Sequence, residues 1–143
     1  MDVITKSFLA AVNSSKGPQI YELSVKEARD VLIKAQSGEV KTLAADIEDR
    51  EIPCGPKGKV SIRIIRPKGM NEILPVVMYF HGGGWVLGDK NTHDRLVREI
   101  ANGAKAAVVF VNFTPSPEAQ YPVPIEEAYA ATKYIAVNGK TLN

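Results

Sequence analysis

Two segments of the chain carry hydrophobic residues at consecutive positions. Residues 75–80 (PVVMYF) and 106–111 (AAVVFV) have this pattern, which is typical of strands covered on both faces. Between them, apolar residues recur at helical spacing, which predicts a helix over 92–104 with Asn91 or Thr92 as its cap. The order strand, helix, strand predicts a right-handed crossover and a parallel strand pair. The apolar stripe of this helix comprises Leu96, Val97, Ile100, Ala101 and Ala104.

Residues 46–66 follow a different pattern, in which apolar and polar positions alternate. Val60, Ile62 and Ile64 alternate with Ser61 and Arg63, which predicts an antiparallel hairpin around a turn at 53–58. After the second buried strand, a proline-rich loop over 114–124 leads to a predicted final helix over 124–137. The chain from residue 46 onward therefore predicts a half-sheet with crossover helices.

The first 37 residues predict two helices that are separated by Gly17-Pro18. Ser24 and Glu27 have the spacing of a capping box at the start of the second helix, and Gly38 is placed to end it. We expect the two helices to form a cap segment, residues 1–37. One face of the second helix is predicted to carry Val25, Ala28, Leu32 and Ala35.

Composition excludes several classes of protein. The 18 basic and 16 acidic residues form no basic run, so we expect no nucleic-acid partner and no anionic lipid partner. No apolar run approaches the roughly 20 residues that a membrane span needs, so a soluble protein is expected. Cys54 is the only cysteine, which excludes an intrachain disulfide and favours a cytoplasmic location.

Three consecutive glycines, 82–84, directly follow the first buried strand. Glycine is costly in conformational entropy, so a run of three needs a physical reason. One reason is a tight turn. The other is that a backbone without Cβ atoms can aim its N–H groups at the negative oxygen that develops during acyl transfer.

The surrounding residues favour the second reason, because they resemble a known family. His81-Gly82-Gly83-Gly84-Trp85 resembles the oxyanion motif of the hormone-sensitive-lipase-like branch of the α/β hydrolases. Residues 111–122 resemble the second block of that family, although Asn112, Thr114 and Pro115 stand where many relatives have Asp, Arg and Leu. The resemblance implies an α/β fold, specifically a partial α/β-hydrolase fold with N-terminal helices, a leading antiparallel hairpin and parallel strands with crossover helices.

The resemblance also implies roles for the residues of the motif. The backbone N–H groups of Gly83 and Gly84 would form the oxyanion hole, and Gly82 would permit the turn. His81 would hold the shape of the loop, and Trp85 would lie near the pocket wall. The substrate implied is a small or medium acyl ester, with no cofactor.

The nucleophile of the family is missing from these residues. None of the seven serines lies in Gly-x-Ser-x-Gly, and His81 and His93 are the only histidines. We therefore expect residues 1–143 to form a single incomplete α/β-hydrolase domain, with the cap segment at 1–37 and the half-sheet with its oxyanion loop at 46–143. We expect no turnover from this chain alone.

Other candidate sites are weaker. His81 and His93 lack a supporting cluster of Cys or carboxylate residues, so no metal site is expected. We expect Ser116 to be part of a rigid turn, and Glu118 and Glu127 to make structural hydrogen bonds. The charged residues of helix 92–104 are expected to form a solvated face; they are Asp94, Arg95, Arg98 and Glu99.

An alternative to an esterase portion is a non-enzymatic binding or assembly module. If strand 75–80 normally pairs with a strand that follows in the family, its outer edge is open here. We therefore expect a homo-oligomer with strand 75–80 near the contact.

Overall fold

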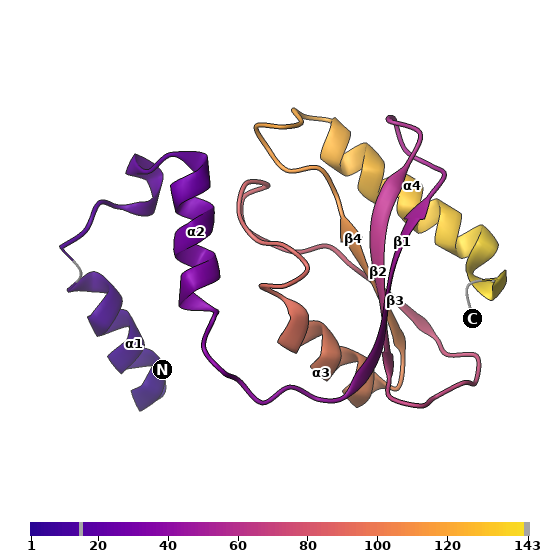
Figure 1. Cartoon of the computed structure of the whole chain (residues 1–143), viewed down its shortest axis with the longest axis horizontal. Coiled ribbons are helices and arrows are strands. Elements are labelled where there is room, and N and C mark those ends of the chain that lie inside the picture. The colour runs from indigo at the N-terminus through magenta and orange to yellow at the C-terminus, as the bar shows by residue number, and fades with distance from the viewer. Residues whose placement is uncertain (15, 142–143) are drawn as a thin grey trace.

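A four-stranded mixed sheet forms the centre of the computed structural model, which describes residues 1–14 and 16–141 (Figure 1). The strand order is β1-β2-β4-β3, where β1 pairs antiparallel with β2, β2 antiparallel with β4, and β3 parallel with β4. The predicted hairpin and the predicted parallel pair are both confirmed. The strands are β1 Ala45–Ile52, β2 Val60–Pro67, β3 Val76–Tyr79 and β4 Ala107–Asn112.

Two helices cover opposite faces of this sheet (Figure 1). On one face, α3 (Asp94–Ala104) packs Val97 and Ala101 against Val108 and Phe110 of β4. On the other face, α4 (Val123–Asn138) packs Ala131 and Ile135 against the alternate residues of the same strand, Val109 and Val111. Because alternate side chains of β4 enter two different cores, its apolar residues are consecutive.

Strand β3 lies at the edge of the sheet, so the expectation that it is covered on both faces is only partly met. Within the part of the chain that the structure describes, β4 is the one strand that pairs with it. Val76 is 46% exposed, and Phe80, which follows the strand, is 44% exposed. A run of apolar residues predicts burial, but an edge position removes one of the two neighbouring strands that would bury it.

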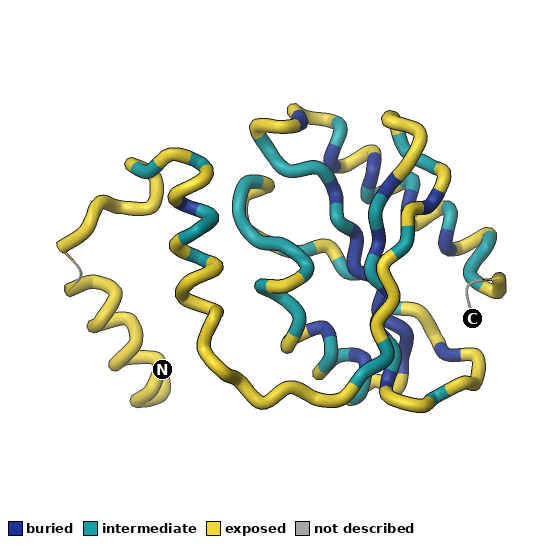
Figure 2. Tube along the Cα trace, in the orientation of Figure 1, coloured by how far each residue is buried: buried dark blue, intermediate teal, exposed yellow. Residues whose placement is uncertain are grey.

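The N-terminal segment contains α1 (Val3–Asn13), the short 3₁₀ helix η1 (Ile20–Glu22) and α2 (Val25–Ala35). The predicted capping box is present, because the Ser24 hydroxyl accepts from the Glu27 N–H and Glu27 accepts from the Ser24 N–H. Gly38 does not end α2, which stops three residues earlier at Ala35. Of the predicted apolar face only Ala28 is buried (Figure 2). The division of the chain into a cap segment and a half-sheet stays a prediction.

The start of α3 also differs from the expectation. His93 precedes the helix, while Asp89 accepts hydrogen bonds from the backbone N–H groups of Asn91 (2.8 Å) and Thr92 (2.7 Å). Asn91 and Thr92 therefore belong to the turn that Asp89 stabilises, and neither caps α3.

The charged residues of α3 are not all solvated. Arg95 pairs with Glu99 in an exposed position, as predicted. Arg98, in contrast, pairs with Asp94 in a partly buried position and donates to the carbonyl of Leu43. Arg98 thus connects α3 to the segment before β1. Among the described residues, no helix is long and apolar enough to cross a membrane.

Candidate oxyanion-loop site

The loop that joins β3 to α3 turns sharply at its glycines. Residues 81–88 are called the glycine loop below. The backbone angle φ is +123° at Gly83, +64° at Gly84 and +58° at Trp85, which is unusual for a residue with a side chain. The carbonyl of Gly83 accepts from the N–H of Leu87 at 2.9 Å and closes the turn. The left-handed angles begin at Gly83 and not at Gly82, to which the turn was assigned.

Gly83 and Gly84 differ in the space around them. A Cβ atom at Gly83 would lie 2.0 Å from the carbonyl oxygen of Leu87, so the loop closes on itself there. A Cβ atom at Gly84 would meet nothing within 4 Å. Gly83 is therefore required by packing, whereas Gly84 borders open space.

The N–H groups of Gly83 and Gly84 are available as donors. Among residues 1–14 and 16–141, no hydrogen bond within the protein uses either N–H. Two adjacent unpaired donors, of which the one at Gly84 borders open space, are an arrangement that could bind an anionic oxygen.

His81, the first residue of the glycine loop, is held in a stack of aromatic rings. Its ring lies parallel to those of Phe113 (centroids 4.4 Å apart) and Phe110 (5.3 Å), and Nδ1 donates to the carbonyl of Gly82 at 2.8 Å. Burial lowers the pKa of His81, although the hydrogen bond to Gly82 opposes this shift. A neutral, stacked ring is suited to supporting the loop and poorly suited to carrying charge.

A pocket of about 360 Å³ lies beside Gly84. It is called the loop pocket below. Its volume is at the lower end of the range for small-molecule sites. One wall comes from the glycine loop and the other from the proline loop, residues 113–122, together with the start of α4. The lining residues are Gly84, Trp85, Ser116, Tyr121, Pro124 and Ile125.

Sequence reasoning placed Trp85 near a pocket but did not identify Tyr121, Pro124 or Ile125. A signal for them existed, because the proline loop follows β4 and the glycine loop follows β3. Loops after neighbouring parallel strands meet at the same edge of the sheet, where ligands bind in open α/β folds.

The remaining candidate residues make structural contacts. The Ser116 hydroxyl donates to the carbonyl of Ala119 at 3.0 Å. Glu127 is buried and accepts from the N–H of Thr114 (2.6 Å) and from its hydroxyl (2.9 Å). Glu118 pairs with Arg29. The structural hydrogen bonds predicted for Glu118 and Glu127 are therefore confirmed.

His93 lies next to His81, with ring centroids 5.3 Å apart. Its Nδ1 is 3.1 Å from the carbonyl oxygen of Asp89, to which it can donate. In the part of the chain that the structure describes, no group of three or more His, Cys, Asp or Glu residues could hold a metal ion.

Comparison with known proteins places this geometry in context. A family described as alpha/beta hydrolase fold matches residues 77–143. An α/β hydrolase of Acanthamoeba polyphaga mimivirus is 39% identical over all 143 residues, and the match covers 40% of the viral protein. The esterase LipI of Mycobacterium tuberculosis is 47% identical over 88 residues, which are 60% of this chain and 28% of LipI.

A solved structure agrees with the sequence relatives. The crystal structure of a thermostable esterase from Pseudomonas putida superimposes with a TM-score of 0.91 at 42% identity. The superposition covers 96% of this chain and 43% of the esterase. The fold, the glycine loop and these matches together show that the chain belongs to the hormone-sensitive-lipase-like family of α/β hydrolases. It spans less than half the length of each relative described here.

Proposed function

We propose that residues 1–143 supply the oxyanion loop and the acyl-binding loop pocket of a serine carboxylesterase acting on small or medium acyl esters. The observation that supports this proposal most directly is that the N–H groups of Gly83 and Gly84 have no acceptor within the described residues, and that Gly84 lines the loop pocket. Such preorganised donors stabilise a developing oxyanion, and losing one typically costs about 10²- to 10³-fold in kcat.

The loop pocket supports the choice of substrate class. Trp85, Tyr121 and Ile125 are large side chains that suit the hydrocarbon part of an ester. A pocket of about 360 Å³ favours short and medium chains over long ones. The similarity to esterases agrees with this proposal.

We further propose that these 143 residues do not turn over an ester by themselves. No serine among them lies in a nucleophile elbow, and burial disfavours the protonated form of the stacked His81, which makes this residue a poor general base. The test is hydrolysis of a short-chain p-nitrophenyl ester by the purified chain, before and after a serine-directed organophosphonate. We expect no turnover and no mass adduct. Inhibitable turnover with a single adduct would contradict the proposal.

The oxyanion role itself is best tested in a working enzyme. In a chimera, this chain replaces the matching part of the Pseudomonas putida esterase, and Gly83→Ala displaces the loop donors. We expect kcat to fall about 10²-fold or more. Gly103→Ala is the matched control, because Gly103 lies in α3 and a Cβ atom there meets nothing within 4 Å. Equal activity of the two variants would refute the oxyanion role.

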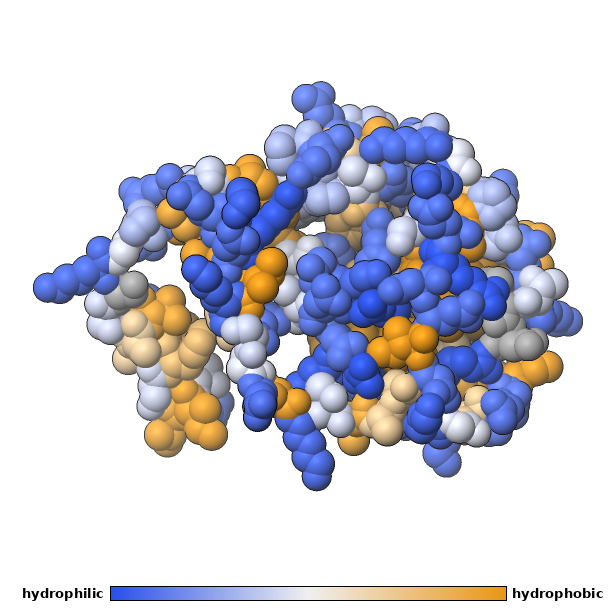
Figure 3. All heavy atoms as spheres, viewed as in Figure 1, coloured by the Kyte–Doolittle hydropathy of each residue, from blue (hydrophilic) through white to orange (hydrophobic). Residues whose placement is uncertain are grey.

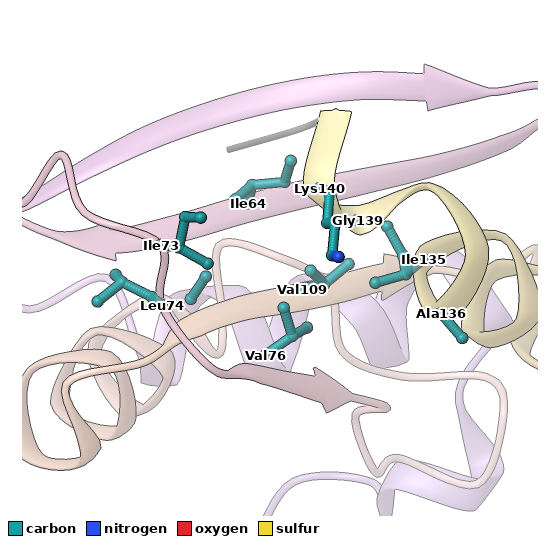
Figure 4. A pocket seen from close by; sticks show the side chains of 10 residues that line it. Ile64, Ile73, Leu74, Val76, Val109, Ile135, Ala136, Gly139 and Lys140 are labelled. Atoms are coloured by element: carbon teal, nitrogen blue, oxygen red, sulfur yellow. The ribbon is translucent and has the colours of Figure 1, made fainter.

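A second candidate function, assembly through the sheet edge, is favoured by the open edge of β3. Residues 75–80 contain no charge, although exposed edge strands usually carry charges that prevent strand pairing. Beside this edge runs an apolar groove of about 220 Å³, lined by Ile64, Ile73, Val76, Val109 and Ile135 (Figure 4). We propose that a second copy of the chain pairs with β3, because two identical uncharged strands bring no like charges together.

Light scattering at micromolar concentration tests this assembly. We expect a dimer or larger oligomer that Val76→Lys converts to a monomer, because the substitution places a charge at the edge. Val31→Lys on α2 is the control, since Val31 (47% exposed) matches Val76 (46%) in exposure. A monomer before any substitution would rule the assembly out.

A further inference from the structure

The N-terminal helices have little apolar contact with the rest of the protein. α1 has no buried residue, and in α2 only Ala28 is buried. Exposed apolar side chains cover much of α1 in the space-filling view (Figure 3). All residues from 36 to 44, which lead from α2 to β1, are exposed (Figure 2). Polar contacts must therefore determine much of the position of α2.

One side chain of α2 makes four hydrogen bonds to distant parts of the chain. Arg29 donates through Nε to the carbonyl of Val86 (2.8 Å) and through Nη2 to the carbonyl of Ser116 (2.9 Å). Its two terminal nitrogens also bind both carboxylate oxygens of Glu118, at 2.7 and 2.9 Å. The planar guanidinium is suited to this, because its five N–H donors have a fixed fork geometry.

The acceptors of Arg29 belong to the two loops that form the loop pocket. Val86 follows Trp85 in the glycine loop, and Ser116 lies in the proline loop. The two loops are also joined directly, because the N–H of Ser116 donates to the carbonyl of Trp85 at 2.7 Å. Arg29 thus bridges the glycine loop and the proline loop, which form the walls of the pocket.

We infer that Arg29 is a positioning residue that couples α2 to the loop pocket by holding the glycine loop against the proline loop. The role of the pocket in binding an acyl group rests on the proposed function, but the coupling itself requires no ester. The hydrogen bonds from Arg29 also lower the pKa of Glu118 to about 2, so the carboxylate is charged at neutral pH. Because Arg29 binds both loops, a displacement of α2 would act on both walls of the pocket.

Amide hydrogen exchange, measured by NMR on the 143-residue chain without ester, tests this coupling. We expect Arg29→Gln to accelerate exchange at the N–H of Ser116 about tenfold, since hydrogen bonds to charged groups are the stronger class. Tenfold corresponds to about 1.4 kcal/mol of local opening free energy. Exchange at Val109, in the centre of the sheet, should not change. Because Trp85 is the only tryptophan, its emission spectrum and its quenching by acrylamide should change together with Ser116 exchange.

Two further variants distinguish the effect of the guanidinium hydrogen bonds from that of a positive charge on α2. Lys26→Gln removes a cation of the same helix, which within the described residues forms its salt bridge with Asp30, and we expect Ser116 exchange to stay at the wild-type rate. Arg29→Lys keeps the charge, but one ammonium group cannot serve both carbonyls and both carboxylate oxygens. We expect its exchange to stay close to that of Arg29→Gln.

Several results would overturn the inference. One is an equal rate of Ser116 exchange in the Arg29→Gln and Lys26→Gln variants. Another is a Ser116 exchange rate in Arg29→Lys that equals the wild-type rate. A third is that Arg29→Gln accelerates exchange at Val109 as much as at Ser116. None of these measurements depends on hydrolysis. Failure of the esterase proposal would therefore leave the coupling intact, and failure of the coupling would leave the oxyanion loop intact.

Discussion

Substitution of the three consecutive glycines of the loop, residues 82–84, by alanine, one at a time, gives the sharpest test of the loop geometry. At Gly83 the backbone angle of +123° lies in a region that residues with side chains avoid, at a cost of about 1–3 kcal/mol. The new Cβ atom would lie 2.0 Å from the Leu87 carbonyl oxygen, so the hydrogen bond between Gly83 and Leu87 must open. That adds about 1 kcal/mol.

The other two glycines serve as internal controls for this substitution. Gly84→Ala meets no neighbour, so it should cost only the left-handed conformation, about 1–2 kcal/mol. Gly82→Ala has neither a left-handed angle nor a close neighbour, and its effect should stay within about 0.5 kcal/mol. The expected order of destabilisation is Gly83, then Gly84, then Gly82.

Urea unfolding, followed by far-UV circular dichroism and by the fluorescence of Trp85, measures this order. We expect Gly83→Ala to lower the free energy of unfolding by about 3 kcal/mol, which corresponds to about 10 °C in Tm for a domain of this size. The fluorescence should also change in the folded state, because Trp85 lies two residues away. Equal costs for Gly82→Ala and Gly83→Ala would refute the assigned backbone geometry.

Three further predictions concern the packing and the pH response. Phe110→Ala removes a fully buried ring and should lower the unfolding free energy in urea by about 3–5 kcal/mol. Glu127→Ala leaves the N–H of Thr114 without its acceptor and should cost about 1–3 kcal/mol in the same assay, with Glu126→Ala as the exposed control. Because the pKa of His81 is lowered in the folded state, the unfolded chain binds more protons, so stability should fall as the pH drops below about 6.5. His81→Gln should remove this part of the pH dependence, and an unchanged profile would contradict the burial of the ring.

Much of the fold could be predicted because it follows from local patterns. The consecutive apolar residues of β4 indicated burial on two faces, and the alternation in β2 indicated a hairpin strand. The spacing of Ser24 and Glu27 indicated a capping box, which needs only residues three positions apart. These features depend on the periodicity of one segment, so no knowledge of its neighbours was required.

Other features depend on contacts between distant segments. Patterning could not show that Asp89, rather than Asn91 or Thr92, stabilises the turn before α3. All three side chains carry an oxygen that can accept a hydrogen bond from the backbone. It could not show that the left-handed angles begin at Gly83, since three adjacent glycines are equivalent in sequence. Nor could it show that Arg98 would leave the solvated face to bind the carbonyl of Leu43.

Local patterns in the chain were enough to predict the order of the elements, the position of the glycine loop after a strand and its resemblance to an oxyanion motif. These conclusions follow because apolar periodicity and runs of glycine act on the backbone within a few residues. The contact of α2 with the loop pocket through Arg29, in contrast, could be seen only in the folded molecule, because the partners of Arg29 lie 57 to 89 positions away. Such contacts depend on how whole elements pack together, and a guanidinium on an exposed helix has many possible acceptors until that packing is known.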